Sequence, residues 1–122
     1  MIHLNLGSNI NSIFGSRSDN ISIAIELLVE SKIKIIKTSN FYETPSYPNV
    51  KNPKFLNIGI LVNYDKNYLD LLSKIYLIEK KIGRIKTKRN DPRVIDIDII
   101  DFKGLIKKDS KDLILPHPKS HL

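Results

Sequence analysis

Two aspartates at alternate positions of an apolar segment, Asp96 and Asp98, are the side chains of this sequence best suited to chemistry. Side chains alternate along a strand, so both carboxylates are expected on one face and the isoleucines around them on the other. Arg89 and Arg93 lie just before this segment, on either side of Pro92. Carboxylates hold Mg²⁺, which in turn holds phosphates, and guanidinium groups neutralise phosphate charge. The pattern predicts phosphoryl or pyrophosphoryl transfer.

A simpler interpretation of the same residues is that they are solvated charges. Aspartate is disfavoured in strands, however, so two of them amid aliphatic residues favour a metal site. Arg89 and Arg93 by themselves would fit a solvated basic loop equally well, and only the neighbouring aspartates favour a functional role.

Other candidates leave two interpretations open. Glu79 lies one helical turn before Gly83 and just off an apolar stripe, so it could face a site or solvent. Phe55 and Asn57 share a strand face and could stack on and hydrogen-bond a flat heterocycle, or they could be a core residue and an edge residue. His117 stands between two prolines and could contact phosphate or be structural.

Several familiar signatures are absent from the sequence. It has no GxxxxGK[ST] loop, no GxGxxG, no kinase motifs, no cluster of metal-binding histidines and no nucleophilic triad. A phosphotransferase with this sequence is therefore not expected to have a P-loop fold.

Composition favours one soluble domain. The chain has 122 residues, of which 41% are apolar and 27% charged, as in ordinary globular proteins. It has no apolar run of roughly 20 residues, no charged leader and no cysteine. These features predict a cytoplasmic protein without a signal peptide or membrane span. The net charge of +7 predicts an anionic partner.

Periodicity predicts strands over residues 2–6, 32–42, 55–62 and 94–102. One helix is expected to begin near Ser18 or Asn20, and a second to begin near Asp65 or Asn67 and end at Gly83. The order β-α-β-β-α-β predicts an α+β, ferredoxin-like fold, with a four-stranded antiparallel sheet covered by both helices on one face. The long connecting loops suggest an active site.

Taken together, these pieces resemble the 6-hydroxymethyl-7,8-dihydropterin pyrophosphokinases of folate synthesis. The matching blocks follow the order of the family over nearly the whole chain: Gly7-Ser8-Asn9, Ser39-Asn40-Phe41-Tyr42-Glu43-Thr44-Pro45, Phe55-Leu56-Asn57, Ile78-Glu79, Gly83-Arg84, Pro92-Arg93-Val94-Ile95-Asp96-Ile97-Asp98-Ile99 and Pro116-His117-Pro118.

The resemblance implies transfer of a pyrophosphoryl group from ATP to the hydroxymethyl oxygen of the pterin, giving AMP. Asp96 and Asp98 would bind two Mg²⁺, and Asp96 would assist removal of the hydroxyl proton. Arg84 and Arg93, with Lys86, would stabilise phosphate charge.

The resemblance also implies two substrate pockets. The ATP site would be lined by Glu79, Lys86, Arg93, Ile99 and His117. The pterin site would be formed by Thr44, Pro45, Phe55, Asn57 and Asp96. The expected partners are these two small molecules, without nucleic acid, and the expected state is a monomer.

Three departures from the family pattern stand out. Asn90-Asp91 replaces a Trp-Gly pair, in a loop that is one residue shorter. Asp112 and Ile114 stand where basic and small polar ATP contacts are expected. The sequence ends at Leu122, before an arginine and a pterin-stacking phenylalanine, so 1–122 is expected to be a single domain truncated at its C-terminus.

Two other functions therefore stay open at this point. One is an inactive homologue that binds nucleotide or pterin without turnover. The other is a basic ferredoxin-like RNA-binding module, although two acids on the last strand would repel phosphate in the absence of a metal.

Overall fold

The computed structural model describes residues 1–46, 51–83 and 92–104. In chain order its elements are β1 (Ile2–Ser8), α1 (Arg17–Glu30), β2 (Lys34–Thr38), β3 (Tyr42–Thr44), β4 (Phe55–Asn63), α2 (Tyr68–Ile82) and β5 (Asp96–Phe102). The predicted α+β class is confirmed, since the described residues form an antiparallel sheet accompanied by two helices.

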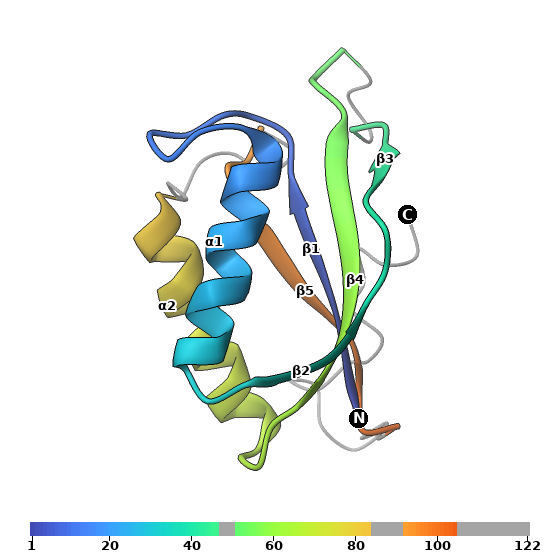
Figure 1. The fold of residues 1–122 in the computed structure, drawn as a ribbon, viewed down its shortest axis with the longest axis vertical. Helices are drawn as coiled ribbons and strands as arrows, with labels where there is room; N and C mark the ends of the chain where they lie inside the picture. The colour runs from blue at the N-terminus through green and yellow to red at the C-terminus, as the bar shows by residue number, and fades with distance from the viewer. Residues whose placement is uncertain (47–50, 84–91, 105–122) are drawn as a thin grey trace.

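β1 is central in the sheet, whose order is β2-β4-β1-β5 with β3 also paired to β4 (Figure 1). All the pairings are antiparallel. Gly7 of β1 lies opposite Asn57 of β4 on one side and Asp96 of β5 on the other. The central strand therefore brings together two segments that are far apart in the sequence.

The prediction of one continuous strand over residues 32–42, and with it the count of four strands, is wrong. β2 ends at Thr38 and β3 begins at Tyr42, and both pair with the same edge of β4. The three residues between them lie opposite only two residues of β4, so one residue is extra and the ladder is interrupted, as at a bulge. Ser39 bridges the gap, because its N–H donates to the Gly59 carbonyl at 2.8 Å and its hydroxyl accepts from the Gly59 N–H at 2.9 Å.

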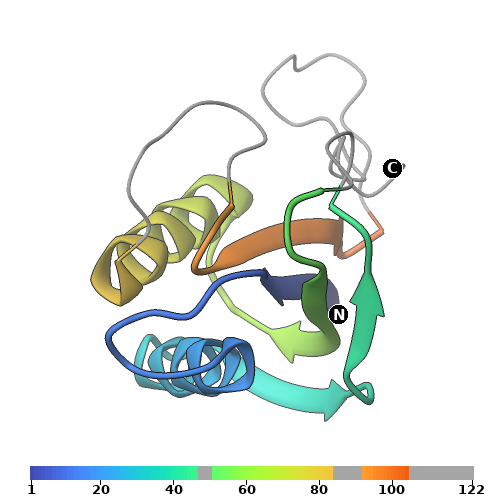
Figure 2. The ribbon, with the colours of Figure 1, turned by 90° about the horizontal axis from the view of Figure 1, so that it is seen from above.

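Both helices cover the same face of the sheet (Figures 1 and 2). α1 begins earlier than predicted: Ser16 is its N-cap and forms a capping box with Asp19, while Asn20 is buried within the helix. The predicted ends of α2 are confirmed, with Asn67 as N-cap and Gly83 as C-cap at a φ of 107°, a left-handed conformation that glycine adopts without strain.

The core lies between the helices and the sheet. Alternate residues of β1, β4 and β5 face the helices and pack against the apolar faces of α1 and α2; the buried aliphatic residues include Ile2, Leu4, Leu6, Ile21, Leu28, Ile58, Ile60, Val62, Leu71, Ile75, Ile82, Ile97 and Ile99. The intervening residues of the strands form the opposite, open face of the sheet. Within the described residues, neither helix has the length and apolarity needed to cross a bilayer.

Candidate active site

The two aspartates lie on the open face of β5, as their alternation in the sequence predicts. Asp96 and Asp98 are half-buried, whereas Ile97 and Ile99 are buried on the helix side. Asp98 pairs with Asn5 and Asp96 with Gly7, so both carboxylates stand beside the central strand. This arrangement gives one face a pair of neighbouring acidic side chains.

Arg93 lies next to this pair, in the segment that leads into β5. Its Nη1 atom is 3.5 Å from Oδ1 of Asp96, and its side chain is only 15% exposed. At this distance the two groups form an ion pair without a good hydrogen bond, and within the described residues Nη1 is buried without a hydrogen-bond partner. A buried donor of this kind suits an anion that would complete its hydrogen bonding.

The residues predicted to recognise a heterocycle meet at the end of β4. Thr44 of β3 pairs with Phe55, and the Thr44 hydroxyl accepts a hydrogen bond from Asn57 Nδ2 at 2.9 Å. Pro45, which follows Thr44, is exposed. Asn57 is 6% exposed and belongs to a strand with partners on both sides, so the alternative that it is an edge residue is wrong.

Asn5 and Tyr42 join this group, although neither was among the residues predicted to form the site. Tyr42 Oη is 2.7 Å from Asn5 Oδ1, and Asn5 Nδ2 is 3.3 Å from Asn57 Oδ1. A polar residue between Leu4 and Leu6 was the available signal for Asn5, because alternation already placed it on the open face.

Gly7 leaves room on the central strand for the side chains of Asn57 and Phe55. A Cβ atom at Gly7 would lie 2.9 Å from Asn57 Oδ1 and 3.3 Å from Phe55 Cδ1. Any larger residue would therefore displace side chains that the sequence predicts to contact a substrate.

Glu79 reaches the aspartate-bearing strand from α2. It is 3% exposed, and its Oε2 accepts a hydrogen bond from the Ile97 backbone N–H at 2.9 Å. The alternative that Glu79 is an ordinary surface residue is wrong. Ile99 of β5, another predicted ATP contact, packs its side chain in the core.

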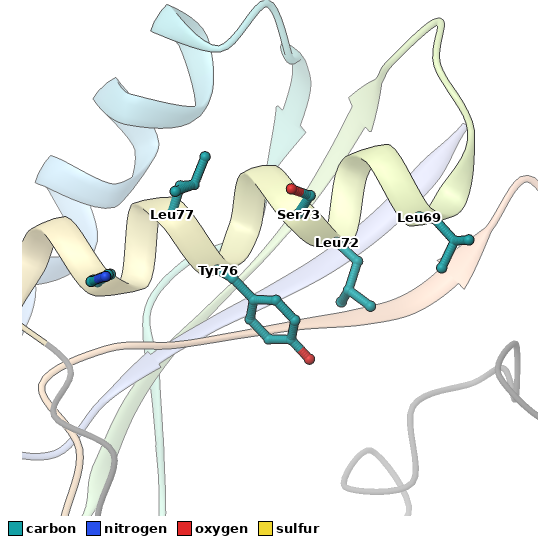
Figure 3. Close-up of a pocket in the computed structure, with 6 residues that line it drawn as sticks. Leu69, Leu72, Ser73, Tyr76 and Leu77 are labelled. Carbon is teal, nitrogen blue, oxygen red and sulfur yellow. The ribbon is translucent and has the colours of Figure 1, made fainter.

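A shallow apolar pocket lies elsewhere, along the outer side of α2 (Figure 3). Its lining contains none of the predicted site residues and consists of Leu69, Leu72, Ser73, Tyr76, Leu77 and Lys80. The predicted site residues that the structure describes are therefore separate from this pocket.

Some predicted site residues lie outside the described residues. They are Arg84, Lys86, Arg89 and His117, together with the departures Asn90, Asp91, Asp112 and Ile114. Their predicted roles stay predictions.

The site fits Mg²⁺ as a partner of phosphate rather than as an ion in a protein cage. Among residues 1–46, 51–83 and 92–104, no three acidic or histidine side chains are grouped so that they could hold a metal. Mg²⁺ keeps several waters, however, and is commonly bound by one or two carboxylates together with substrate phosphates. Asp96 and Asp98 supply two carboxylates, and the buried Nη1 of Arg93 suits the phosphate.

Comparison with known proteins gives a consistent result. Residues 3–122 match the family model for 7,8-dihydro-6-hydroxymethylpterin-pyrophosphokinase. A 2-amino-4-hydroxy-6-hydroxymethyldihydropteridine pyrophosphokinase of Methylorubrum extorquens is 33% identical over 94% of this chain and 70% of its own length.

Longer relatives match over only part of their length. The folic acid synthesis protein FOL1 of Dictyostelium discoideum is 40% identical over 97% of this chain and 17% of its own length. The bifunctional protein FolKE of Lactococcus lactis subsp. lactis is 37% identical over 97% of this chain and 33% of its own. This chain thus spans about a third or less of these two relatives. Since the family model matches nearly every residue, the chain belongs to the 7,8-dihydro-6-hydroxymethylpterin-pyrophosphokinase family.

Proposed function

We propose that this chain transfers a pyrophosphoryl group from ATP to 6-hydroxymethyl-7,8-dihydropterin, giving AMP and the pterin diphosphate, in folate synthesis. The observation that carries the proposal is the position of Gly7 between Asn57 and Asp96. This pairing supports a heterocycle site and a metal-phosphate site on one face of the sheet, on the two sides of β1.

In the proposed reaction the hydroxymethyl oxygen forms a bond to the β-phosphorus of ATP. The bond from this phosphorus to the α–β bridging oxygen breaks, and AMP leaves with that oxygen. Asp96 accepts the hydroxyl proton. Such transfers depend mainly on positioning and charge stabilisation, which suits the pairing of Asp96 and Arg93 at the open face.

Asp96 and Asp98 would hold two Mg²⁺ ions. The chemistry that Mg²⁺ supplies when bound is neutralisation of phosphate charge and alignment of the phosphates with the hydroxyl. Arg93 would donate to a phosphate oxygen through Nη1, together with Arg84 and Lys86. Glu79, the Ile99 backbone and His117 complete the proposed ATP site.

The pterin would lie against Phe55, with Thr44 and Pro45 beside it. One Asn57 Nδ2 hydrogen is donated to Thr44 at 2.9 Å. Its second Nδ2 hydrogen bond, to the Phe55 carbonyl, is longer at 3.4 Å, and Oδ1, which accepts from Asn5 at 3.3 Å, has a further lone pair. A ring edge that carries a donor would match Oδ1, and a neighbouring acceptor would compete with the Phe55 carbonyl for the weaker of the two N–H bonds.

The observed fold also supports a more specific proposal about its type. The strand order β2-β4-β1-β5 with both helices on one face supports a ferredoxin-like arrangement to which β3 is added. We also propose that 1–122 is a single domain, that it acts as a monomer in the cytoplasm, and that neither nucleic acid nor membrane is its partner.

The experiment that tests the function measures AMP formation from ATP and 6-hydroxymethyl-7,8-dihydropterin, with Mg²⁺ and with excess EDTA. AMP that requires both the pterin and Mg²⁺ is the expected result. ATP consumption that gives ADP would contradict pyrophosphoryl transfer. Pterin binding without AMP would instead indicate a homologue that binds without turnover.

A further inference from the structure

Asn9 is a buried amide that contacts two other segments of the chain. It follows β1 and is 2% exposed. Its Oδ1 accepts from the Arg93 backbone N–H at 2.6 Å, and its own N–H donates to the Arg93 carbonyl at 3.0 Å. Its Nδ2 donates to the Pro53 carbonyl at 3.1 Å and to the Ser46 hydroxyl at 3.0 Å.

Backbone groups fix the orientation of this amide. A backbone N–H only donates and a carbonyl only accepts, so Oδ1 must face Arg93 and Nδ2 must face Pro53. A flipped amide would lose both hydrogen bonds inside the protein, where unpaired polar groups are costly. Ser46 reinforces the arrangement by donating its own hydroxyl to the Pro53 carbonyl at 2.6 Å.

The two segments that Asn9 joins belong to the two halves of the proposed site. Ser46 comes directly after Thr44 and Pro45, and Pro53 comes two residues before Phe55. On the other side, Arg93 is next to Asp96. One side chain thus spans the distance between the pterin contacts and the phosphate contacts.

We propose that Asn9 is a positioning residue. It holds Ser46 and Pro53, which adjoin the proposed pterin contacts, at a fixed position relative to Arg93. The inference rests on the proposed function and adds a role to a residue that contacts neither substrate in it. Loss of the hydrogen bonds from Asn9 to Ser46 and Pro53 is therefore expected to weaken pterin binding more than ATP binding.

Asn9→Asp is the sharpest test, because it keeps the shape of the side chain and one oxygen for the Arg93 N–H. The second oxygen then faces the Pro53 carbonyl, where a donor is required. We expect the pterin KM, and the pterin Kd measured from its fluorescence, to rise about tenfold, while the ATP KM changes less than about twofold.

Asn20→Asp is the matched control. Asn20 is another fully buried amide, and its Nδ2 donates to the Ile10 carbonyl at 3.0 Å. It secures the same loop between β1 and α1 without contacting Arg93 or Pro53. We expect the control to lower the melting temperature and leave pterin affinity unchanged; an equal loss of pterin affinity in both variants would overturn the inference.

Ser46→Ala provides a second variant should Asn9→Asp fail to fold, since it removes only a hydroxyl from the same connection. We expect a rise of about threefold in pterin Kd. Wild-type pterin affinity in a folded Asn9→Asp or Ser46→Ala protein would overturn the inference. Wild-type protein that binds pterin but makes no AMP would refute the proposed reaction alone, and wild-type protein that does not bind pterin would refute both.

Discussion

At the scale of single residues, the position of each residue along its strand determines which side chains lie on the open face of the sheet. Asp96 and Asp98 share a face because side chains alternate, and their neighbours across the sheet are Gly7 and Asn5 of the central strand. Both aspartates remain partly exposed beside these small and amide side chains. The acidic pair and its surroundings can therefore be tested one residue at a time.

Replacement of Asp96 or Asp98 by Asn removes a negative ligand while keeping the side-chain shape. We expect pterin-dependent AMP formation to fall by about two orders of magnitude or more, with an unchanged circular dichroism spectrum. Asp101→Asn is the control, since Asp101 is an exposed acid near the far end of the same strand. Wild-type rates in either of the first two variants would refute the metal assignment.

Gly7→Ala tests whether close packing around the central strand matters for the pterin. The new methyl group would meet Asn57 Oδ1 at 2.9 Å, so the amide must move from its partners Thr44 and Asn5. We expect pterin KM to rise about fivefold. Gly59→Ala is the matched glycine on the same face, where the methyl group would contact His3 and Ser39 instead; an equal effect there would contradict a local role for Gly7.

At the scale of elements, α2 secures the strand that carries the aspartates. β5 pairs with β1 only, so its other edge is not covered by a strand within the described sheet. Glu79 satisfies the Ile97 N–H at that edge, between the two aspartates. A helix residue thus helps to hold the strand that carries the proposed catalytic groups.

Glu79→Ala would leave the Ile97 N–H without this acceptor. We expect the free energy of unfolding in urea to fall by about 1–3 kcal/mol, together with slower AMP formation. Glu79→Gln keeps an acceptor oxygen and should recover most of the stability. If the Ala variant were as stable as wild type, the hydrogen bond to Ile97 would not hold β5 in place.

At the scale of the whole molecule, the helices are held to the sheet by the apolar core and also by polar contacts such as the one between Tyr64 and Asp70. Tyr64, just after β4, is 5% exposed and donates its hydroxyl to Asp70 in the first turn of α2. Burial, reinforced by the Asp70 hydrogen bond, raises the pKa of Tyr64 to about 12 from an ordinary value of 10.0. The folded state thus holds this proton more tightly than the unfolded state does.

This difference predicts a pH dependence of stability. The contribution of Tyr64 is complete below pH 10.0 and is lost as the pH rises toward about 12. Tyr64→Phe should therefore lose less stability than wild type between these pH values, as measured by urea unfolding across the range. The lysines titrate in both proteins, so their effect on stability cancels when the two curves are compared. Tyr76→Phe is the control for loss of a tyrosine hydroxyl, because Tyr76 is exposed. Parallel curves for wild type and Tyr64→Phe would contradict the prediction.

Much of the local structure could be predicted from the sequence because its causes are local. The alternation of Asp96 and Asp98, the apolar stripe of α2 and the caps Asn67 and Gly83 depend only on neighbours along the chain. The interruption between β2 and β3 could not be predicted, since it depends on how Ser39 meets Gly59 across the sheet.

The sequence by itself predicted the kind of chemistry and determined the α+β class and the family, because residue types and their spacing are sufficient for these. Only the tertiary structure decided which groups meet. Strand pairing placed Gly7 between Asn57 and Asp96, burial turned Glu79 toward β5, and the Asn9 amide joined Pro53 to Arg93. These are contacts between distant parts of the chain, and their geometry follows from packing and hydrogen bonding that no local pattern encodes.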